Sequence, residues 1–286
     1  MKSKLILILG GDSRSLFLGE YLEKQGLQVC YYAFNDTDCF HSLGEAVSQA
    51  GCIILPLPFT RDRLTLNTPL FNEKISVKEL CALADTEKFF FGGQMPKCFT
   101  EELDLRSVRY CDYFTLEELA VYNAVPTSEG VMGILISELP VTVHSAKCAV
   151  TGYGKVGRQI AQTLKNLGAD VTVFARKQSD FADAFSRGIK GEPYSALREN
   201  ERDFDALINT VPAKVLTRAE LKNLKHDCLL IETASAPFGT DFQAAKELAL
   251  NVIKANSLPG KVAPKTAGEI IGRAVIPVMY KEGLID

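Results

Sequence analysis

The feature that most constrains this chain is a glycine-rich turn between a short apolar run and an amphipathic segment. Residues 147–176 read KCAVTGYGKVGRQIAQTLKNLGADVTVFAR, and the turn is the stretch GYGKVG at 152–157. Beyond the turn, apolar residues recur at the spacing of one helix face: Val156, Ile160, Ala161, Leu164 and Leu167. Gly168 suits the end of that helix, and Val171 and Val173 then predict a second strand. A strand, a glycine turn, a helix and a strand within about thirty residues predict a βαβ unit that binds a dinucleotide.

Each glycine of the turn has a separate physical role. Gly152 permits the tight turn, Gly154 lets the backbone approach a pyrophosphate, and Gly157 lets the helix pack close to the strand. The helix begins at Lys155 and Val156, where free N–H groups and a partial positive charge favour phosphate. The alternative is a tight turn that binds nothing, but the flanking strand and amphipathic helix favour the binding site.

The end of the second predicted strand indicates which nucleotide binds. An NAD site usually has Asp or Glu at this position to bind the ribose 2′-hydroxyl. Here Arg176 and Lys177 follow the strand, and no carboxylate comes before Asp180. Two cations suit a 2′-phosphate through charge-assisted hydrogen bonds, so the sequence favours NADP over NAD. The alternative is a solvated basic loop.

The rest of the second half continues the same pattern. Strands are predicted at 204–210, 228–231 and 251–254, and the first two end in small polar turns. We expect these turns to line the cofactor, through Thr210, Val211, Pro212, Thr233 and Ala234. The stretch 258–268 reads as a stiff loop that feeds a final apolar helix at 267–280, close to the expected place of the nicotinamide ring.

The first half predicts a second doubly wound parallel sheet. Strands are expected at 4–9, 28–33, 52–55, 88–91 and 108–114, and helices from about 13 and at 43–50 and 77–84. The turn Gly10-Gly11-Asp12 lacks dinucleotide spacing. Asp12 or Ser13 can cap the helix that follows, and this cap takes the place of a phosphate.

The chain of 286 residues is therefore expected to hold two α/β domains, each a doubly wound parallel sheet (Rossmann-like), with a cleft between them. The expected ranges are a substrate domain at 1–125, a linking helix at 126–140 and an NADP-binding domain at 141–265. A C-terminal helix at 266–286 is expected to pack back on the first domain. Pro126 is interpreted as the start of the linking helix, after a helical stretch at 115–122.

Composition excludes several classes of protein. A net charge of −3 without a basic block disfavours nucleic acid and anionic membranes as partners. No stretch is expected to span a membrane, and the apolar run at 4–9 is too short for a signal peptide. The eight cysteines include no CxxC pair, and Cys52, Cys148 and Cys228 lie in apolar runs, which indicates buried thiols in a reducing cytoplasm. The three histidines are isolated, so no metal site is expected.

A resemblance to a known family becomes specific when the motifs are taken together. In order along the chain they are GGDSR, PLPFTRD, PTSEG, the stretch 147–176, LIETASAPFGTDF and LPGKVAPKTAGEIIG. PTSEG and GYGKVG alone also suggest adenosylhomocysteinase and alanine dehydrogenase relatives. The ordered set resembles the A subunit family of bacterial dipicolinate synthase over nearly the whole chain. Glu232 departs from the family, in which Asp is expected.

The resemblance implies NADP-linked oxidation, at a CH–CH group, of dihydrodipicolinate or its 4-hydroxytetrahydro precursor to pyridine-2,6-dicarboxylate. It further implies a cytoplasmic enzyme of the sporulating mother cell whose partner is a separate B subunit, and a homo-oligomer is expected. A dicarboxylate substrate fits the cations on loops that should face the cleft: Arg14, Arg61 and Lys265. For Arg14 an ion pair is an equal alternative. Glu129 and Asp62 are candidate bases for proton removal, although Glu129 can equally cap a helix.

Two other functions fit the same residues. One is a different NAD(P)-dependent amino-acid or imino-acid dehydrogenase. The other is a scaffold protein that binds NADP without chemistry and holds the B chain in place.

Overall fold

The chain is described by a computed structural model over residues 4–35, 37–199 and 201–286. It divides into two compact units. Unit 1 comprises Met1–Tyr122 together with Ala263–Asp286, and unit 2 comprises Asn123–Val262. The chain therefore enters unit 2 within one long helix and returns to unit 1 for its last segment.

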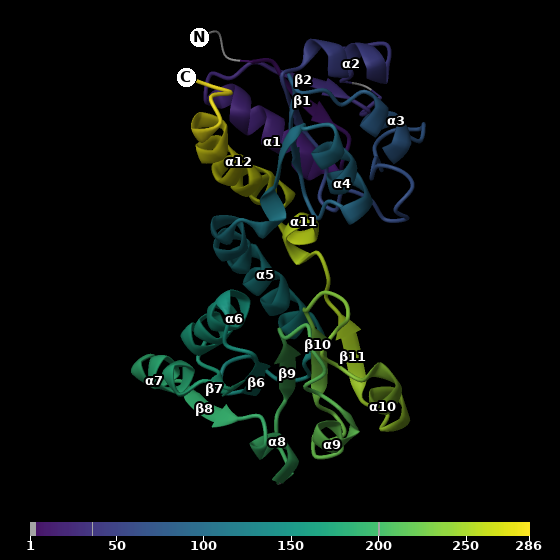
Figure 1. The fold of residues 1–286 in the computed structure, drawn as a ribbon. Coiled ribbons are helices and arrows are strands. Elements are labelled where there is room, and N and C mark those ends of the chain that lie inside the picture. The colour runs from purple at the N-terminus through teal and green to yellow at the C-terminus, as the bar shows by residue number, and fades with distance from the viewer. Residues whose placement is uncertain (1–3, 36, 200) are drawn as a thin grey trace. The chain divides into compact units, whose positions relative to one another are not determined.

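Unit 1 contains a five-stranded sheet in which every neighbouring pair is parallel (Figure 1). Its strands are β1 (Ile6–Leu9), β2 (Val29–Tyr32), β3 (Cys52–Ile54), β4 (Phe89–Gly92) and β5 (Arg109–Asp112). All five strands were predicted, and β1, β3 and β4 are short runs of buried, mostly apolar residues. Their order is β2-β1-β3-β4-β5, so the direction of winding changes between β1 and β3. In open parallel sheets, ligands bind at such a switch point, beyond the carboxyl ends of the strands.

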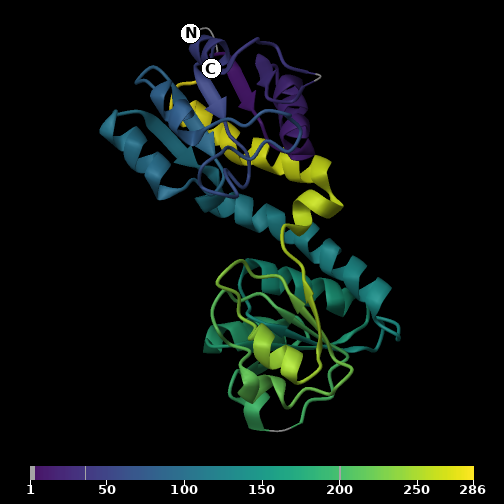
Figure 2. The ribbon, with the colours of Figure 1, turned by 90° about the vertical axis from the view of Figure 1, so that its right-hand side faces the viewer.

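Helices cover this sheet on both faces. They are α1 (Ser13–Lys24), α2 (Leu43–Gln49), α3 (Val77–Ala82), α4 (Lys97–Leu105) and α12 (Pro264–Lys281), with a 3₁₀ turn at Tyr113–Thr115. The C-terminal helix α12 packs along α1, and the two ribbons lie side by side in Figures 1 and 2. Two glycines permit the close approach. A Cβ on Gly268 would lie 2.4 Å from the Arg14 carbonyl oxygen, and one on Gly272 would lie 2.4 Å from the Tyr21 ring.

Unit 2 contains a six-stranded parallel sheet in the order β11-β10-β9-β6-β7-β8. Its strands are β6 (Lys147–Thr151), β7 (Asp170–Ala175), β8 (Lys190–Pro193), β9 (Ala206–Asn209), β10 (Leu229–Glu232) and β11 (Asn251–Lys254). Its helices after α5 are α6 (Lys155–Asn166), α7 (Gln178–Ser186), α8 (Ala196–Glu199), α9 (Arg218–Leu221), α10 (Phe242–Glu247) and α11 (Leu258–Val262). Counted from β6, the strand order is 3-2-1-4-5-6, which is the dinucleotide-binding order, with its switch point between β6 and β9.

The predicted helix break at Pro126 is wrong. Helix α5 runs without interruption from Glu117 to Glu138, with Pro126 inside it, so the expected linking helix at 126–140 is the second part of a longer helix. A proline inside a helix removes one backbone hydrogen bond and clashes with the carbonyl of residue i−4. The Thr127 hydroxyl donates to the Asn123 carbonyl at 2.6 Å, one residue away from that defect. Burial of Val131 and Leu135 in the core of unit 2 then supports the continuous helix.

Helix α5 also passes a length and hydropathy test for a membrane span, which the sequence analysis did not anticipate. It is the one helix in the described ranges that does so. Val131, Met132 and Leu135 of α5 are buried against strand residues of unit 2. The apolar residues of α5 are therefore explained by its packing in a protein core.

Other elements also differ from expectation. Helices α4 and α7 and strand β8 were not predicted, and the expected stiff loop at 258–268 contains α11 and the start of α12. The thiols of Cys52, Cys148 and Cys228 are buried as expected.

Candidate functional site

The glycine-rich turn lies at the carboxyl end of β6, the first strand of the dinucleotide-binding order. Helix α6 begins at Lys155 with Gly154 as its N-cap, and no side chain caps its N-terminus. Helix α1 of unit 1 contrasts with it, because the Asp12 side chain accepts from the Arg14 N–H there, as predicted. The uncapped first turn of α6 leaves backbone donors for an anion such as a pyrophosphate.

The three glycines of the turn meet different surroundings. Gly152 has a φ of +94°, and a Cβ there would lie 2.5 Å from the Thr210 hydroxyl oxygen. A Cβ on Gly157 would lie 2.1 Å from the Gly152 carbonyl oxygen, so this glycine lets the helix pack against the turn. A Cβ on Gly154 would have no heavy atom within 4 Å. Gly152 and Gly157 are therefore required by the fold, whereas Gly154 borders open space.

Threonines from the neighbouring strands complete this edge of the sheet. The Thr210 hydroxyl donates to the Thr151 carbonyl at 2.9 Å, and the Thr233 hydroxyl donates to the Asn209 carbonyl at 2.7 Å. These bonds connect the carboxyl ends of β6, β9 and β10, where cofactor contacts were predicted. The other predicted contacts follow the same strands, with Val211 half-buried, Pro212 exposed and Ala234 buried. Val156, in the first turn of α6, is half-buried.

A buried carboxylate organises the loop that follows β10. Glu232 is fully buried, and it accepts hydrogen bonds from the backbone N–H groups of Ala234, Gly239 and Thr240. The Asn209 amide donates to both of its oxygens, at 2.7 and 2.9 Å. Sequence reasoning missed this pair because its two members are distant in the chain. Their common position at the ends of adjacent predicted strands was the one available signal.

The end of β7 carries the predicted specificity residues. Arg176 and Lys177 are both exposed there. The nearest following carboxylate, Asp180, accepts from Arg158 Nη2 at 3.1 Å, and Arg158 Nε also donates to the Tyr153 carbonyl at 3.0 Å. Asp180 therefore serves to join α6 and α7.

In unit 1, Arg14 is buried rather than on the surface. Its Nε and Nη2 donate to the two oxygens of Asp12, at 2.9 and 2.8 Å, and Nη2 also donates to the Leu57 carbonyl. Burial alone would raise the pKa of Asp12, but the hydrogen bonds and charge of Arg14 outweigh it and lower this pKa. Arg14 thus links the loops after β1 and β3, at the switch point of the sheet, by means of an ion pair.

Asp62 lies in the loop after β3, and its side chain accepts hydrogen bonds within a turn of that loop. Its oxygens accept from the N–H groups of Leu64 and Thr65 and from the Thr65 hydroxyl, each at 2.8 Å, and from the Thr60 hydroxyl at 3.2 Å. These bonds, with those from Thr65 and Leu64 largest, lower the pKa of Asp62 well below its ordinary value. A carboxylate stabilised in this way is a weak base, so its contacts favour a role as turn anchor.

The remaining predicted residues lie in different units. Lys265 is exposed in the first turn of α12 in unit 1. Glu129 is exposed in the middle of α5, in unit 2, so it does not cap a helix start as the sequence suggested. Within the ranges that the structure describes, no three His, Cys, Asp or Glu side chains are grouped so as to hold a metal ion.

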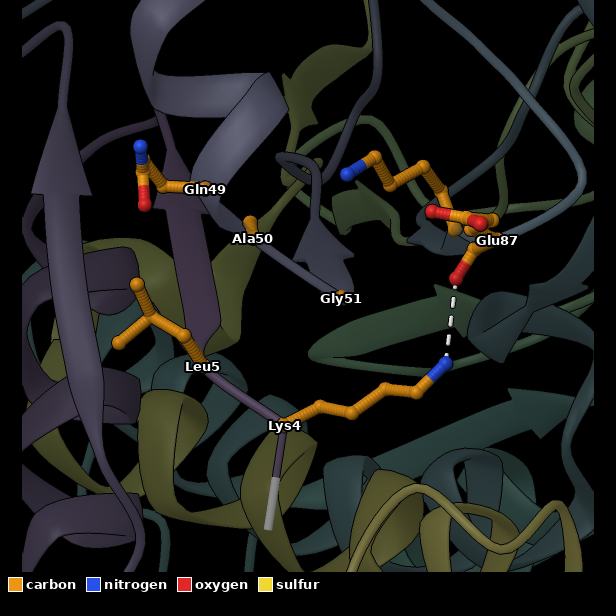
Figure 3. Close-up of a pocket in the computed structure, with 7 residues that line it drawn as sticks. Lys4, Leu5, Gln49, Ala50, Gly51 and Glu87 are labelled. Atoms are coloured by element: carbon orange, nitrogen blue, oxygen red, sulfur yellow. Dashed lines mark hydrogen bonds between the residues drawn. The ribbon is translucent and has the colours of Figure 1, made fainter. Parts of the chain in front are cut away.

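One surface cavity lies at the opposite edge of the unit 1 sheet. Its volume is about 470 Å³, and its lining includes Lys4, Gly51 and Lys88, which precede β1, β3 and β4 (Figure 3). Lys4 Nζ donates to the Glu87 carbonyl at 3.1 Å, and Lys88 Nζ to the Ser48 carbonyl at 2.9 Å. Because ligands of open parallel sheets bind at the carboxyl ends of the strands, we assign this cavity no ligand.

Two family profiles cover most of the chain. The profile of the N-terminal domain of the dipicolinate synthase A subunit matches residues 5–114. The profile of the NAD binding domain of D-isomer specific 2-hydroxyacid dehydrogenases matches residues 136–255. The glycine turn and the strand order of unit 2 agree with the second match, and unit 2 is a nicotinamide-nucleotide-binding domain of the dehydrogenase type.

Similarity extends over the whole length of known proteins. The chain is 31% identical over 281 residues to the A subunit of dipicolinate synthase from Bacillus subtilis (strain 168), with 94% of each protein covered. It is similar to the crystal structure of the dipicolinate synthase A subunit from Bacillus halodurans, with a TM-score of 0.89 and 28% identity, over 96% of this chain and 97% of that one. The A chain of dipicolinate synthase from Bacillus subtilis gives a TM-score of 0.88 and 28% identity, over 98% and 97%. The resemblance inferred from sequence motifs is confirmed, and the chain belongs to the family of dipicolinate synthase A subunits.

Proposed function

We propose that this chain is the catalytic A subunit of a dipicolinate synthase. It oxidises dihydrodipicolinate, or its 4-hydroxytetrahydro precursor with loss of one water molecule, to pyridine-2,6-dicarboxylate with NADP⁺ as the oxidant. The observation that carries the proposal is 31% identity, along 94% of both chains, to the A subunit of a dipicolinate synthase, joined to an intact dinucleotide turn. The reaction acts on a CH–CH group of a cyclic dicarboxylate.

Unit 2 would hold the cofactor through its glycine turn. The backbone at Gly152, Gly154 and Gly157 and the uncapped start of α6 would bind the pyrophosphate, and the loops at Thr210 and Thr233 would flank the rest of the molecule. When bound, the nicotinamide supplies a hydride acceptor. Because Gly154 borders open space and no side chain caps the helix, the residues present fit this group.

The preference for NADP rests on the end of β7. Exposed Arg176 and Lys177 suit a 2′-phosphate, and Asp180 is engaged by Arg158 instead of facing a ribose hydroxyl. NAD is the less favoured cofactor.

Aromatisation of the dihydro ring removes one hydride and one proton, so a base must receive the proton. Glu129 is our candidate, because its carboxylate is exposed and does not cap the start of a helix. Asp62 is the weaker candidate, because the donors around it already stabilise its charged form. For the substrate carboxylates we propose Arg61 and Lys265, with Arg14 supporting them from its ion pair with Asp12.

The family also suggests a setting for the reaction. We propose that the chain works with a separate B subunit, in the cytoplasm of the sporulating mother cell, within a homo-oligomeric assembly. The Bacillus subtilis relative is named as the A subunit of its enzyme, which supports the first of these points.

The test is an assay of the purified chain alone and with the B subunit. Enzymatically generated dihydrodipicolinate precursor and NADP⁺ are supplied, and NADPH and pyridine-2,6-dicarboxylate are measured together. We expect both products in equal amounts, and a lower rate with NAD⁺. Tight NADP⁺ binding without turnover under any of these conditions would instead support a non-catalytic scaffold. Turnover of an amino acid or imino acid in place of the dihydro compound would support a different dehydrogenase.

A further inference from the structure

One buried donor in unit 1 has no partner among the described residues. The amide nitrogen Nδ2 of Asn67 makes no hydrogen bond, although Asn67 is only 7% exposed. Its amide oxygen accepts from Arg61 Nε at 3.1 Å. Because Arg61 can only donate, this contact assigns the oxygen to the side of Arg61, so the nitrogen with its two hydrogens faces the other way. A buried donor without an acceptor is costly, which points to a ligand or water that supplies one.

A surface cavity lies beside this donor. Its volume is about 300 Å³, and Asn67 and Arg61 both line it. Such a volume is at the lower end of the range for small-molecule sites, roughly 300–1,000 Å³, and far above the roughly 30 Å³ that one water takes. Leu66, Pro69 and Phe71 supply apolar walls. The cavity therefore combines two donors with a surface that suits a flat ring.

The cavity lies at the carboxyl edge of the sheet, where ligands are expected. A Cβ on Gly10, directly after β1, would lie 2.5 Å from Thr68 Cγ2, so the segment around Thr68 packs against the end of that strand. The Asn67 N–H donates to the Phe59 carbonyl at 2.9 Å, and Leu66 N–H donates to the Ile75 carbonyl at 2.9 Å. The turn anchored by Asp62 closes this loop directly beside Arg61. Hydrogen bonds within the loop thus fix its conformation, and they hold the donors of Asn67 and Arg61 in place before a ligand binds.

Charged side chains of both signs line the cavity. Asp62 and Glu73 line it together with Arg61 and Lys74. The oxygens of Asp62 are occupied by donors of its own turn, and Glu73 and Lys74 are exposed neighbours in sequence. The Asn67 amide nitrogen is left as the group that needs an acceptor, and the exposed Arg61 guanidinium beside it can only donate.

We propose that this cavity is a carboxylate-binding subsite in which Asn67 Nδ2 and the terminal nitrogens of Arg61 hold one carboxylate of a small planar ring compound. The identification of that compound with the cyclic dicarboxylate rests on the proposed function. The site itself rests on the unpartnered donor, the neighbouring guanidinium and the cavity. It adds Asn67 as a binding residue, and the turn that Asp62 anchors lies directly beside Arg61.

The test uses the full chain without nucleotide and measures binding of pyridine-2,6-dicarboxylate by calorimetry. Asn67→Asp keeps an oxygen for Arg61 but replaces the donor with a negative oxygen, and Arg61→Gln removes the cation. We expect each to weaken binding roughly tenfold to a hundredfold, as loss of a hydrogen bond to a charged group predicts. Arg63→Gln is the matched control, because Arg63 is exposed, carries the same charge and does not line the cavity. It should bind within about twofold of the natural protein.

Several outcomes would overturn the subsite. Unchanged affinity in Asn67→Asp with an intact melting temperature would mean that water alone satisfies the amide. An equal loss in Arg63→Gln would show a general charge effect, and tighter binding of inorganic phosphate than of the dicarboxylate would show the wrong ligand class. Should Asn67→Asp fail to fold, Arg61→Gln against Arg63→Gln decides the question, since both side chains are exposed.

The failure of the subsite and the failure of the proposed function are distinguishable. NADP⁺ binding and turnover are measured on the same variants. Turnover with an unchanged KM in Arg61→Gln and Asn67→Asp would remove the subsite and leave the reaction. Dicarboxylate binding with the expected pattern, but without turnover by the natural protein and its B subunit, would leave the subsite and remove the reaction.

Discussion

Both carboxylate oxygens of Glu232 lie within 2.9 Å of the Asn209 amide nitrogen, and both residues are fully buried. The pair joins the ends of β9 and β10, and the same carboxylate accepts three backbone N–H groups of the following loop. This loop begins with Thr233 and Ala234, for which we predict cofactor contacts. The conformation of the loop with these predicted contacts therefore depends on one carboxylate, which need not touch the nucleotide itself.

The first prediction concerns that carboxylate. Glu232→Gln turns one acceptor oxygen into a donor that faces other donors, so we expect the free energy of unfolding to fall by about 2–4 kcal/mol. We also expect weaker NADP⁺ binding because the loop loses its anchor. Chemical denaturation and calorimetry measure the two effects. Glu247→Gln makes the same charge change at an exposed ion pair with Arg218 and should alter neither. Equal stability of the two variants would refute the role given to Glu232.

The second prediction separates the glycines of the turn. Gly154→Ala places a methyl group in open space, so the melting temperature should hold while NADP⁺ affinity falls at least about tenfold, and Gly154→Val should abolish binding. Gly157→Ala forces a Cβ against the Gly152 carbonyl and should cost about 1–3 kcal/mol of stability. Thermal unfolding and nucleotide titration of the three variants provide the comparison. Undiminished affinity in Gly154→Val would remove the cofactor from this turn.

The third prediction tests the choice between NADP and NAD. Arg176→Ala removes the guanidinium expected at the 2′-phosphate, so we expect the ratio of NADP⁺ to NAD⁺ affinity to fall by roughly tenfold or more. NAD⁺ binding should change little. Arg187→Ala removes an exposed arginine that pairs with Asp183 on α7 and serves as the control. Parallel losses for both nucleotides in Arg176→Ala would argue against a 2′-phosphate contact.

The fourth prediction concerns acid stability in unit 1. Arg14 lowers the pKa of Asp12 in the folded protein, against the opposing effect of burial. A carboxylate whose folded pKa is depressed stabilises the fold above its unfolded pKa, about 3.9, and loses this contribution as the pH falls through the lower folded value. Asp12→Asn keeps a helix cap but removes the charge beside buried Arg14. At neutral pH we expect the free energy of unfolding of Asp12→Asn to be about 1–3 kcal/mol lower than that of the natural protein.

Melting temperatures of the natural protein and Asp12→Asn across pH 2–7 measure this effect. The two curves should run parallel above about pH 5 and converge below the unfolded pKa of Asp12. A separation that stays constant down to the lowest pH would show that the ion pair with Arg14 contributes nothing to stability.

Much of the fold could be predicted from local patterns. Strands β1, β3 and β4 of unit 1 and the βαβ unit at 147–176 contain short apolar runs next to glycine, and such signals are read without knowledge of distant residues. Pro126 misled the prediction because the pattern of a helix start was genuine, but burial of Val131 and Leu135 outweighs the lost backbone bond. Leu167 was placed on the buried face of α6, yet it is the C-cap residue and is 43% exposed, because the helix ends before it.

The site was less predictable, because its key contacts join distant segments. Thr210 could be placed at a strand end, but the Asn209–Glu232 pair depends on β9 and β10 being neighbours. Arg14 was weighed as a surface ion pair or an anion site, and no local pattern could have shown its bond to Leu57. Asn67 carried no signal at all in the sequence, since an asparagine in a loop is ordinary until its surroundings are known.

Unit 1 is built from two segments that are far apart in the sequence, and its core includes Ile270, Ala274 and Val275 of α12 beside Ile6 and Ile8 of β1. During synthesis the segment before α5 emerges early, but the core of unit 1 stays incomplete until α12 has also left the ribosome. Unit 2 is contiguous and can mature while the nascent chain is still tethered. We therefore expect unit 2 to become stable before unit 1 during synthesis, and a chain cut before α12 to keep only unit 2 folded.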